Sequence, residues 1–212
     1  MRADDLTPVA QDYLKALWSA TEWGGAPVTP AALAERFGTS RANVTATVKR
    51  LAAQGLLVHE PYRPVVLTDE GRRCAVEMVR RHRLLETFLV AHLDYSWDEI
   101  HEEAEQLEHA ASPRLVARID VALGYPARDP HGDPIPDPDG RMRSPGPGEE
   151  GVGLLSELGA GERCTVLRVA DEDPTVLHRA DALGIRPGAE LTVTEDLLAD
   201  TALAAAVRIR RR

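Results

Sequence analysis

Residues 29–58 read TPAALAERFGTSRANVTATVKRLAAQGLLV, and this stretch decides the fold of the N-terminal third of the chain. Thr29 can cap a helix that ends at Gly38. Thr39 or Ser40 can cap a second helix, whose apolar residues recur at helical spacing. Two short helices joined by a tight turn, the second with small, polar and basic residues outside, are typical of a helix-turn-helix.

The segments around this motif complete a DNA-reading unit. Apolar residues at helical spacing predict a preceding helix over 7–20. Two β-rich runs, 56–60 and 65–67, predict a hairpin wing with its turn at 61–64. The segment from Val28 to Arg73 is net basic, although the whole chain carries a formal charge of −9. Phosphate contacts require such local basic charge.

The rest of the chain divides into a helical part and a strand-rich part. Three further helices are predicted, at 69–93, 97–107 and 112–123. The Ala, Leu and Val faces of the last two could bury against a second copy of the chain. Pro and Gly then become dense between 124 and 153, which indicates a loop and linker. Alternating strands in the remaining residues predict a small β-barrel of about 60 residues.

Composition sets the class of protein. The chain has 212 residues, and its 43% share of hydrophobic residues is ordinary for a soluble protein. The low aromatic share of 4%, with a high content of Ala, Leu and Val, favours a mainly α fold. No apolar run is long enough to span a membrane and no signal peptide is apparent, so we expect a cytoplasmic protein with no membrane partner. Cys74 and Cys164 are far apart in sequence, and we interpret them as inert buried thiols.

A stripe of histidines and carboxylates indicates metal binding. On a helix, His101, Glu105, Glu108 and His109 fall at i, i+4, i+7 and i+8 and therefore share one face. Like charges at this spacing repel unless a cation or solvent intervenes, although acidic runs are usually only solvated surface. His82 and a glutamate four residues later form a second pair. Nitrogen and hard oxygen donors without sulfur favour manganese or ferrous iron.

Several motifs in order resemble the diphtheria toxin repressor family of metal-dependent regulators, in particular its manganese transport regulator branch. They are the Asp12-Tyr-Leu14 helix, Leu33-Ala-Glu-Arg-Phe37, Ser40-x-x-x-Val44-Thr45, Leu67-Thr-Asp-Glu-Gly71, Arg81-His-Arg-Leu-Leu-Glu86, Glu105-x-x-Glu108-His109 and Gly132-Asp-Pro-Ile-Pro136. The C-terminal motif Leu183-Gly-Ile-Arg-Pro-Gly188 resembles the SH3-like domain of ferrous-iron transport accessory proteins. The resemblance covers nearly the whole chain.

The resemblance implies two metal sites. The primary site would use Asp12, Glu105, Glu108 and His109. The ancillary site would use His82, Glu86 and His101, with Glu172 or Asp173 of the SH3-like domain completing it. In the iron-sensing branch, Met and Cys occupy the positions of Asp12 and Glu105, so the carboxylates here point to manganese. Lys15 stands where the manganese branch can carry another acidic ligand, which argues against a tight two-manganese cluster of that kind.

The helix-turn-helix offers candidate DNA contacts of two kinds. Outward residues of the second helix could reach base edges, and these are Ser40, Arg41, Asn43, Thr45 and Thr47. For the two threonines, plain helix surface is an equal alternative. Lys49, Arg50 and the wing residue Arg63 are expected on phosphates. Related repressors carry Pro and Gln where Ala42 and Ala46 stand, so base readout here can differ.

The sequence therefore predicts a metal-dependent repressor, not an enzyme. It would have a winged helix-turn-helix over 1–73, a helical metal-binding and dimerisation domain over 74–140, a linker over 141–152 and an SH3-like domain over 153–212. Mn(II) would activate a homodimer that binds pseudo-palindromic double-stranded operators of metal-homeostasis genes, with Co(II), Zn(II) or Cd(II) as substitutes in vitro. The alternatives are an Fe(II)-dependent repressor of iron uptake genes, a carboxylate-bridged di-metal enzyme and a winged-helix regulator of small organic ligands.

Overall fold

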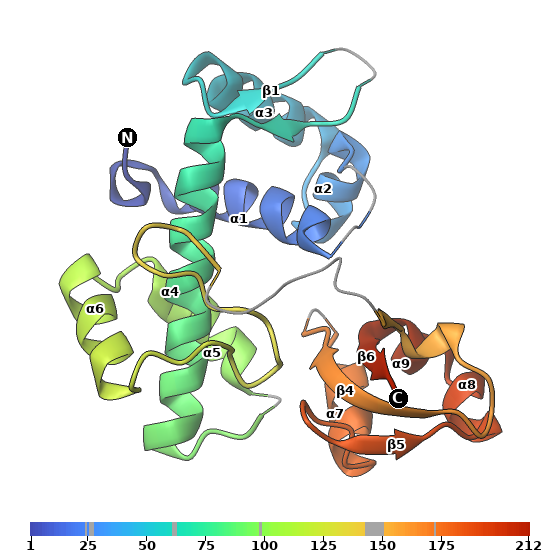
Figure 1. Cartoon of the computed structure of the whole chain (residues 1–212). Helices are drawn as coiled ribbons and strands as arrows, with labels where there is room; N and C mark the ends of the chain where they lie inside the picture. Colours follow the sequence, from blue (N-terminus) through green and yellow to red (C-terminus); the bar gives the residue numbers. More distant parts are fainter. Residues whose placement is uncertain (24, 26–27, 61–62, 98, 143–150, 172) are drawn as a thin grey trace. The chain divides into compact units, whose positions relative to one another are not determined.

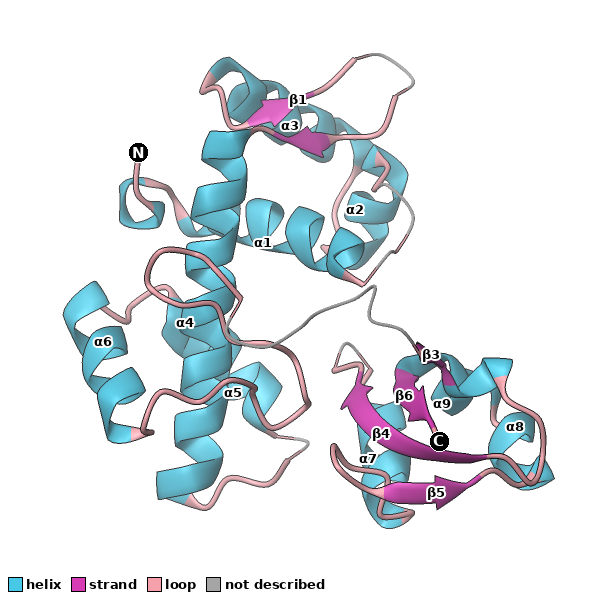
Figure 2. Ribbon diagram, viewed as in Figure 1, coloured by secondary structure: helices cyan, strands magenta, loops and turns pink. Residues whose placement is uncertain are grey.

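The computed structural model describes residues 1–23, 25, 28–60, 63–97, 99–142, 151–171 and 173–212. Within these residues the chain is mainly helical, with short strands after the third helix and a sheet near the C terminus (Figure 1; Figure 2). The predicted mainly α fold class is confirmed. The chain forms two compact units, Met1–Arg81 with Pro136–Arg141 and His82–Ile135 with Met142–Arg212. The four predicted domain bounds stay a prediction.

The first unit contains the helix-turn-helix. Its elements are η1 Ala3–Asp5, α1 Pro8–Glu22, α2 Pro30–Arg36, α3 Arg41–Ala53, β1 Leu57–Val58 and β2 Val66–Leu67. The hydroxyls of Thr29 and Ser40 accept the N–H groups of Ala32 and Asn43, both at 3.2 Å, so Ser40 rather than Thr39 caps α3. These caps satisfy amide groups that would otherwise lack partners and thereby fix where the helices begin.

Apolar packing holds the three helices of this unit together. Leu14 of α1, Leu33 of α2 and Val48 of α3 are almost completely buried. The rings of Tyr13 and Phe37 stack with their centroids 4.5 Å apart. Each large apolar side chain that is buried here stabilises the fold by about 1.5–3 kcal/mol. Because the core is formed by the inner faces of the helices, the outer face of α3 remains available for a ligand.

The predicted wing is present and is shorter than the sequence pattern suggested. β1 pairs with β2 antiparallel, with Leu57 opposite Leu67. The Thr68 backbone N–H donates to the Leu56 carbonyl at 3.0 Å, which ends the hairpin as α4 begins. Gly71 lies so close to that carbonyl that a Cβ atom would collide with it. Residues 61 and 62 of the predicted turn lie outside the described residues.

Helix α4, Asp69–Leu93, begins in the first unit, and its residues from His82 onward belong to the second. The second unit adds α5 Ile100–Glu108 and α6 Pro113–Ala122. Helix α5 begins later than predicted because the Glu99 carboxylate accepts the Ser96 N–H at 3.2 Å and forms a turn there. Trp97, predicted as helical, is instead buried among apolar residues of the C-terminal sheet domain.

The C-terminal part of the second unit is a four-stranded antiparallel sheet. Its strand order is β3-β6-β4-β5, with β3 Val152–Leu154, β4 Arg163–Val169, β5 Glu190–Thr192 and β6 Val207–Arg211. Three short α-helices also occur there, α7 Pro174–Ala182, α8 Glu195–Ala199 and α9 Thr201–Ala206, together with the 3-10 helix η2 Leu155–Glu157. The strand pattern did not predict them, although Asp173 followed by Pro174 is a helix-start signal. Residues 143–150 of the predicted linker lie outside the described residues.

A buried loop joins the helical and sheet parts of this unit. Residues 131–135 are buried, in contrast to the prediction of an unpacked linker. The Val169 N–H of β4 donates to the His131 carbonyl at 3.0 Å. Arg168 of β4 donates from Nε to both oxygens of Asp133 at 2.6 and 2.7 Å. Gly132 has a φ of +97°, and a Cβ there would collide with the Leu167 carbonyl. The loop is therefore fixed against β4.

Candidate metal centre and nucleic-acid interface

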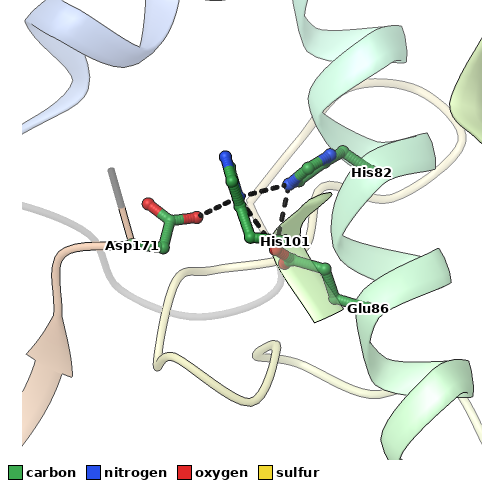
Figure 3. A group of neighbouring side chains, drawn as sticks. All are labelled: His82, Glu86, His101 and Asp171. Carbon is green, nitrogen blue, oxygen red and sulfur yellow. Dashed lines mark hydrogen bonds and ion pairs between the residues drawn. The ribbon is translucent and has the colours of Figure 1, made fainter. Parts of the chain in front are cut away.

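Four side chains from three segments of the second unit meet in one cluster (Figure 3). His82 and Glu86 lie one turn apart on α4 and are buried, His101 projects from α5, and Asp171 follows β4. His82 Nε2 lies 2.9 Å from Glu86 Oε1, and His101 Nδ1 lies 3.3 Å from the same oxygen. His101 Nδ1 is also 3.2 Å from Asp171 Oδ2. We call these four residues the ancillary cluster.

The ancillary cluster is strongly charged in the metal-free protein. Burial would raise the pKa of Glu86, but His82 and the hydrogen bonds from His101 and His82 outweigh it, so the pKa falls well below its usual range. Burial would lower the pKa of His101, yet its hydrogen bonds to Asp171 and Glu86 raise it to about 11. A protonated imidazolium thus stands between two carboxylates. Carboxylates and imidazole nitrogens arranged this way can bind a divalent cation once that proton leaves.

A second group of candidate ligands, Glu105, Glu108 and His109, lies beside this cluster. His82 Nδ1 is 2.7 Å from Glu108 Oε2, and Glu108 is completely buried. Atoms of His82, Glu105 and Glu108 come within 4.8 Å of one another. His109 Nε2 lies 3.9 Å from Glu108 Oε1. The stripe predicted from helical spacing is therefore formed on α5 and the residue that follows it.

Two predicted ligands need separate description. Asp12 is half-buried on α1 in the first unit, and its role as a ligand stays a prediction from the resemblance. The Asp173 side chain accepts the Thr175 N–H at 2.8 Å and caps α7, while Asp171 occupies the place in the ancillary cluster that was predicted for Glu172 or Asp173. Glu172 lies outside the described residues.

Sequence reasoning missed two residues of the buried loop. Asp129 and His131 are buried and approach Glu86, and ligand atoms of the three residues lie within 4.8 Å of one another. Burial, together with the nearby Asp133 and Glu86 carboxylates, raises the pKa of Asp129 well above its usual value. The signal was visible as Asp, His and Asp at alternate positions in a stretch interpreted only as linker.

Sulfur is not part of these clusters. Among the described residues, the groups able to hold a metal consist of His, Asp and Glu. The two cysteines are buried, Cys74 in the first unit and Cys164 in the core of the C-terminal sheet, and burial raises the pKa of each thiol. Hard oxygen and nitrogen donors suit Mn(II) and Fe(II), while copper(I) prefers sulfur.

The first unit presents a polar and basic face on α3. Arg41, Asn43, Lys49 and Arg50 are exposed there, and Arg63 is exposed on the wing. Positive charge on a recognition helix and its wing can bind phosphates while polar side chains reach the bases.

Three predicted contacts on α3 already hold hydrogen bonds. Ser40 caps the helix, and the Thr45 hydroxyl donates to the Arg41 carbonyl at 2.8 Å. The Asn43 side-chain amide donates to the Thr39 hydroxyl at 3.2 Å. Thr47 is half-buried. Thr47 therefore faces the core more than Arg41 or Asn43 does, and all eight DNA contacts stay predictions.

Family models cover most of the chain in three successive matches. They are the N-terminal DNA binding domain of the iron dependent repressors over 5–65, their metal binding and dimerisation domain over 68–137, and the FeoA domain over 154–211. Among the described residues, no helix is long and apolar enough to cross a membrane.

Individual relatives agree with these matches along nearly the full length. The iron-dependent repressor IdeR of Mycobacterium tuberculosis is 34% identical over 197 residues, 90% of this chain and 85% of the relative. A solved manganese-dependent transcriptional repressor in complex with manganese is 41% identical, with a TM-score of 0.82 over 96% of this chain and 100% of that one. The manganese regulator SloR is 28% identical, with a TM-score of 0.75 over 98% of this chain and 100% of that one.

A helix-turn-helix with a basic face and a helical unit rich in His and carboxylate ligands define a metal-dependent DNA-binding regulator. The chain belongs to the diphtheria toxin repressor family of iron-dependent repressors, IdeR included. It is a metal-dependent transcriptional repressor with a dimerisation domain and a C-terminal FeoA, SH3-like domain, and not an enzyme.

Proposed function

We propose that Mn(II) is the physiological activator of this repressor. The observation that carries the proposal is the donor set: Glu105 lies beside His82 and Glu108, and these groups offer only carboxylate oxygen and imidazole nitrogen. Asp12 would add another carboxylate to the primary site. Mn(II) is a hard cation that accepts such ligands, whereas a thiolate or thioether would favour softer metals. The similarity to manganese-dependent repressors supports the same choice.

Fe(II) is the second candidate, because the curated relatives are named iron-dependent repressors. Ferrous iron accepts the same donors, and affinity alone rises from Mn(II) through Fe(II) and Co(II). Co(II), Zn(II) and Cd(II) would substitute in vitro for the same reason. Solved relatives with bound Zn(II) and Cd(II) support that substitution.

The proposed switch joins the DNA-reading unit to the metal-binding unit. Asp12 lies on α1, in the same unit as the recognition helix, while Glu105, Glu108 and His109 belong to the other unit. A cation held by both would fix one unit against the other and thus set the spacing of two recognition helices in a dimer. Dimeric readers need half-sites about one helical turn apart, roughly 34 Å, or a multiple of it. Metal would select the DNA-competent state. Lys15 contributes no acidic ligand to this site.

The domain roles follow from the same proposal. Residues 1–73 would read a pseudo-palindromic operator of metal-homeostasis genes, 74–140 would bind metal and form the homodimer, 141–152 would be the linker, and 153–212 would be the SH3-like domain. Leu107, Leu115 and Val121 of the α5–α6 region are 38%, 49% and 55% exposed, which supports a dimer contact there. Because a repressor must reach the DNA that it regulates, we expect this protein in the cytoplasm.

The metal is tested by operator binding at controlled free-metal concentrations. DNA duplexes are selected from a random library in parallel with Mn(II), Fe(II), Co(II) and Zn(II), and binding is then titrated by fluorescence anisotropy under anaerobic, metal-buffered conditions. The proposal predicts half-maximal binding with Mn(II) at free concentrations found in manganese-replete cells. Activation by Fe(II) at far lower free concentration than Mn(II) would assign the protein to iron.

A further inference from the structure

Trp97 comes from the helical part of the second unit, just before α5, yet its side chain is buried in the C-terminal sheet domain. It is 8% exposed and belongs to the apolar core that Val169 of β4 and Leu177 of α7 also form. The guanidinium carbon of Arg186 lies 6.0 Å from the centroid of the indole ring, which is within the range of a cation–π contact. A side chain of the helical part is therefore anchored inside the sheet domain.

Two polar groups of Trp97 also bind the buried loop that follows α6. The indole N–H donates to the Pro130 carbonyl at 2.9 Å. The Trp97 carbonyl lies 3.0 Å from His131 Nε2, and because a carbonyl oxygen can only accept, Nε2 is the donor. The two rings are tilted against each other with their centroids 5.0 Å apart. Hydrogen bonds are directional, so these contacts fix the orientation of the indole as well as its burial.

The same contacts continue from the loop to Asp171. The His131 carbonyl accepts the Val169 N–H at 3.0 Å, and Asp171 lies two residues beyond Val169. Asp171 Oδ2 is in turn 3.2 Å from Nδ1 of His101, which follows Trp97 by four residues. Trp97 is thus connected to both members of the His101–Asp171 pair, to one through the start of α5 and to the other through the loop and β4.

Asp171 is the member of the ancillary cluster that the sheet domain contributes (Figure 3). His82, Glu86 and His101 lie on α4 and α5, so their spacing is set by the helices. The place of Asp171 depends instead on how the sheet domain is held against those helices. Metal ligands must be held to within about 0.5 Å of their productive positions. A contact that fixes the sheet domain beside α5 can therefore change the affinity of the cluster without touching the metal.

We propose that Trp97 is a positioning residue for the ancillary cluster: it fastens the sheet domain beside α5, holds Asp171 within reach of His101, and so sets the affinity of the cluster for a divalent cation. This inference deepens the proposed function and rests on it, since the cation is taken to be Mn(II). It also assigns a role to Arg186 of the Leu183–Gly188 motif, which covers the outer side of the indole.

The test is a double-variant cycle between Trp97 and Asp171 in the full-length protein. Mn(II) affinity is measured from the electron paramagnetic resonance of free Mn(II) for Trp97→Leu, Asp171→Ala and their combination. All are made in a His109→Ala background, which removes a ligand of the proposed primary site. Leu203→Ala of α9 is the matched control, because it also removes apolar contacts from the core of the sheet domain. Circular dichroism and urea denaturation of the metal-free variants check folding.

Trp97→Leu is expected to weaken Mn(II) binding roughly 10- to 100-fold, the range for residues that orient metal ligands. The combined variant should bind no more weakly than Asp171→Ala does, because Trp97 would act through that carboxylate. Trp97→Phe keeps an aromatic ring and loses the donor to Pro130, so it should show a smaller loss, and it carries the same cycle if the leucine variant does not fold. Unchanged affinity in the folded variants, additive losses in the cycle, or an equal loss in Leu203→Ala would each overturn the positioning role.

Operator binding separates this inference from the proposed function. Manganese-dependent operator binding of the wild type is measured beside the cycle. Its absence would overturn the proposed function even if Trp97 and Asp171 are coupled, whereas additive losses with intact operator binding would overturn the role of Trp97 alone.

Discussion

Raising the pH should strengthen metal binding at the ancillary cluster, because a proton occupies it first. His101 has its pKa raised to about 11 by its hydrogen bonds to Asp171 and Glu86, despite burial that acts the other way. At pH 7 the ring is therefore an imidazolium, and its Nδ1 cannot coordinate a cation. Metal binding must displace that proton, so protons and metal compete for one position.

The magnitude follows from one proton released per metal bound. Below the raised pKa, the apparent affinity should rise tenfold per pH unit, which is about 1.4 kcal/mol per unit. From pH 6.5 to 7.5 we expect a tenfold gain. The effect on folding has the opposite sign: since the folded pKa lies above the model value of 6.5, the stability that the imidazolium contributes to the metal-free protein is complete below pH 6.5 and is lost as the pH rises toward 11.

Isothermal titration calorimetry with Mn(II) can measure this directly. Titrations in two buffers of different ionisation enthalpy give the number of protons released, and a His109→Ala background removes a ligand of the proposed primary site. We expect about one proton per metal at the ancillary cluster. Asp171→Asn weakens the hydrogen bond that raises the pKa of His101 and should reduce the number of protons released. An affinity that stays flat between pH 6.5 and 7.5, with no proton released, would refute the reasoning.

Three further predictions concern other parts of the chain. Arg168→Leu leaves Asp133 buried without its two short contacts and should lower the free energy of unfolding by about 3–5 kcal/mol in urea denaturation. The double variant with Asp133→Leu should recover much of this loss, and a double variant with no recovery would count against a buried ion pair. Ser40→Ala removes the cap of α3 and should cost about 1 kcal/mol in the same assay, whereas an unchanged midpoint would show that the cap is not needed. Lys49→Ala should weaken DNA binding for all sequences alike and reduce the slope of log affinity against log salt by about one; an altered base preference would instead place Lys49 on a base.

The sequence was sufficient where a local signal decided the structure. The caps at Thr29 and Ser40 and the helical apolar period fixed the helix-turn-helix, and α4 has the predicted bounds, Asp69–Leu93. His101 and Glu105 likewise lie on one helix, α5, as their spacing predicted, and their role as ligands stays a prediction. Each of these signals acts within a few residues of the chain, which is why it can be read without tertiary contacts.

The remainder depended on contacts between distant segments. Trp97 was predicted as helical, but it lies before α5 and packs in the apolar core of the sheet domain, a contact that helical spacing could not reveal. The choice of Asp171 over Asp173 depends on which carboxylate faces His101 after β4 ends, since Asp173 is used as a helix cap. His131 lies in a Pro- and Gly-rich stretch, and its meaning appears only when the loop is buried beside Glu86.

The central claim is that metal held by the α5 ligands controls DNA binding. It is tested most directly by manganese titration of operator binding, followed by anisotropy, for the wild type and the double variant Glu105→Ala with His109→Ala. We expect the wild type to bind its operator only when Mn(II) is present, and the folded double variant to lose that response. Operator binding by the double variant that still depended on manganese as in the wild type would contradict the claim.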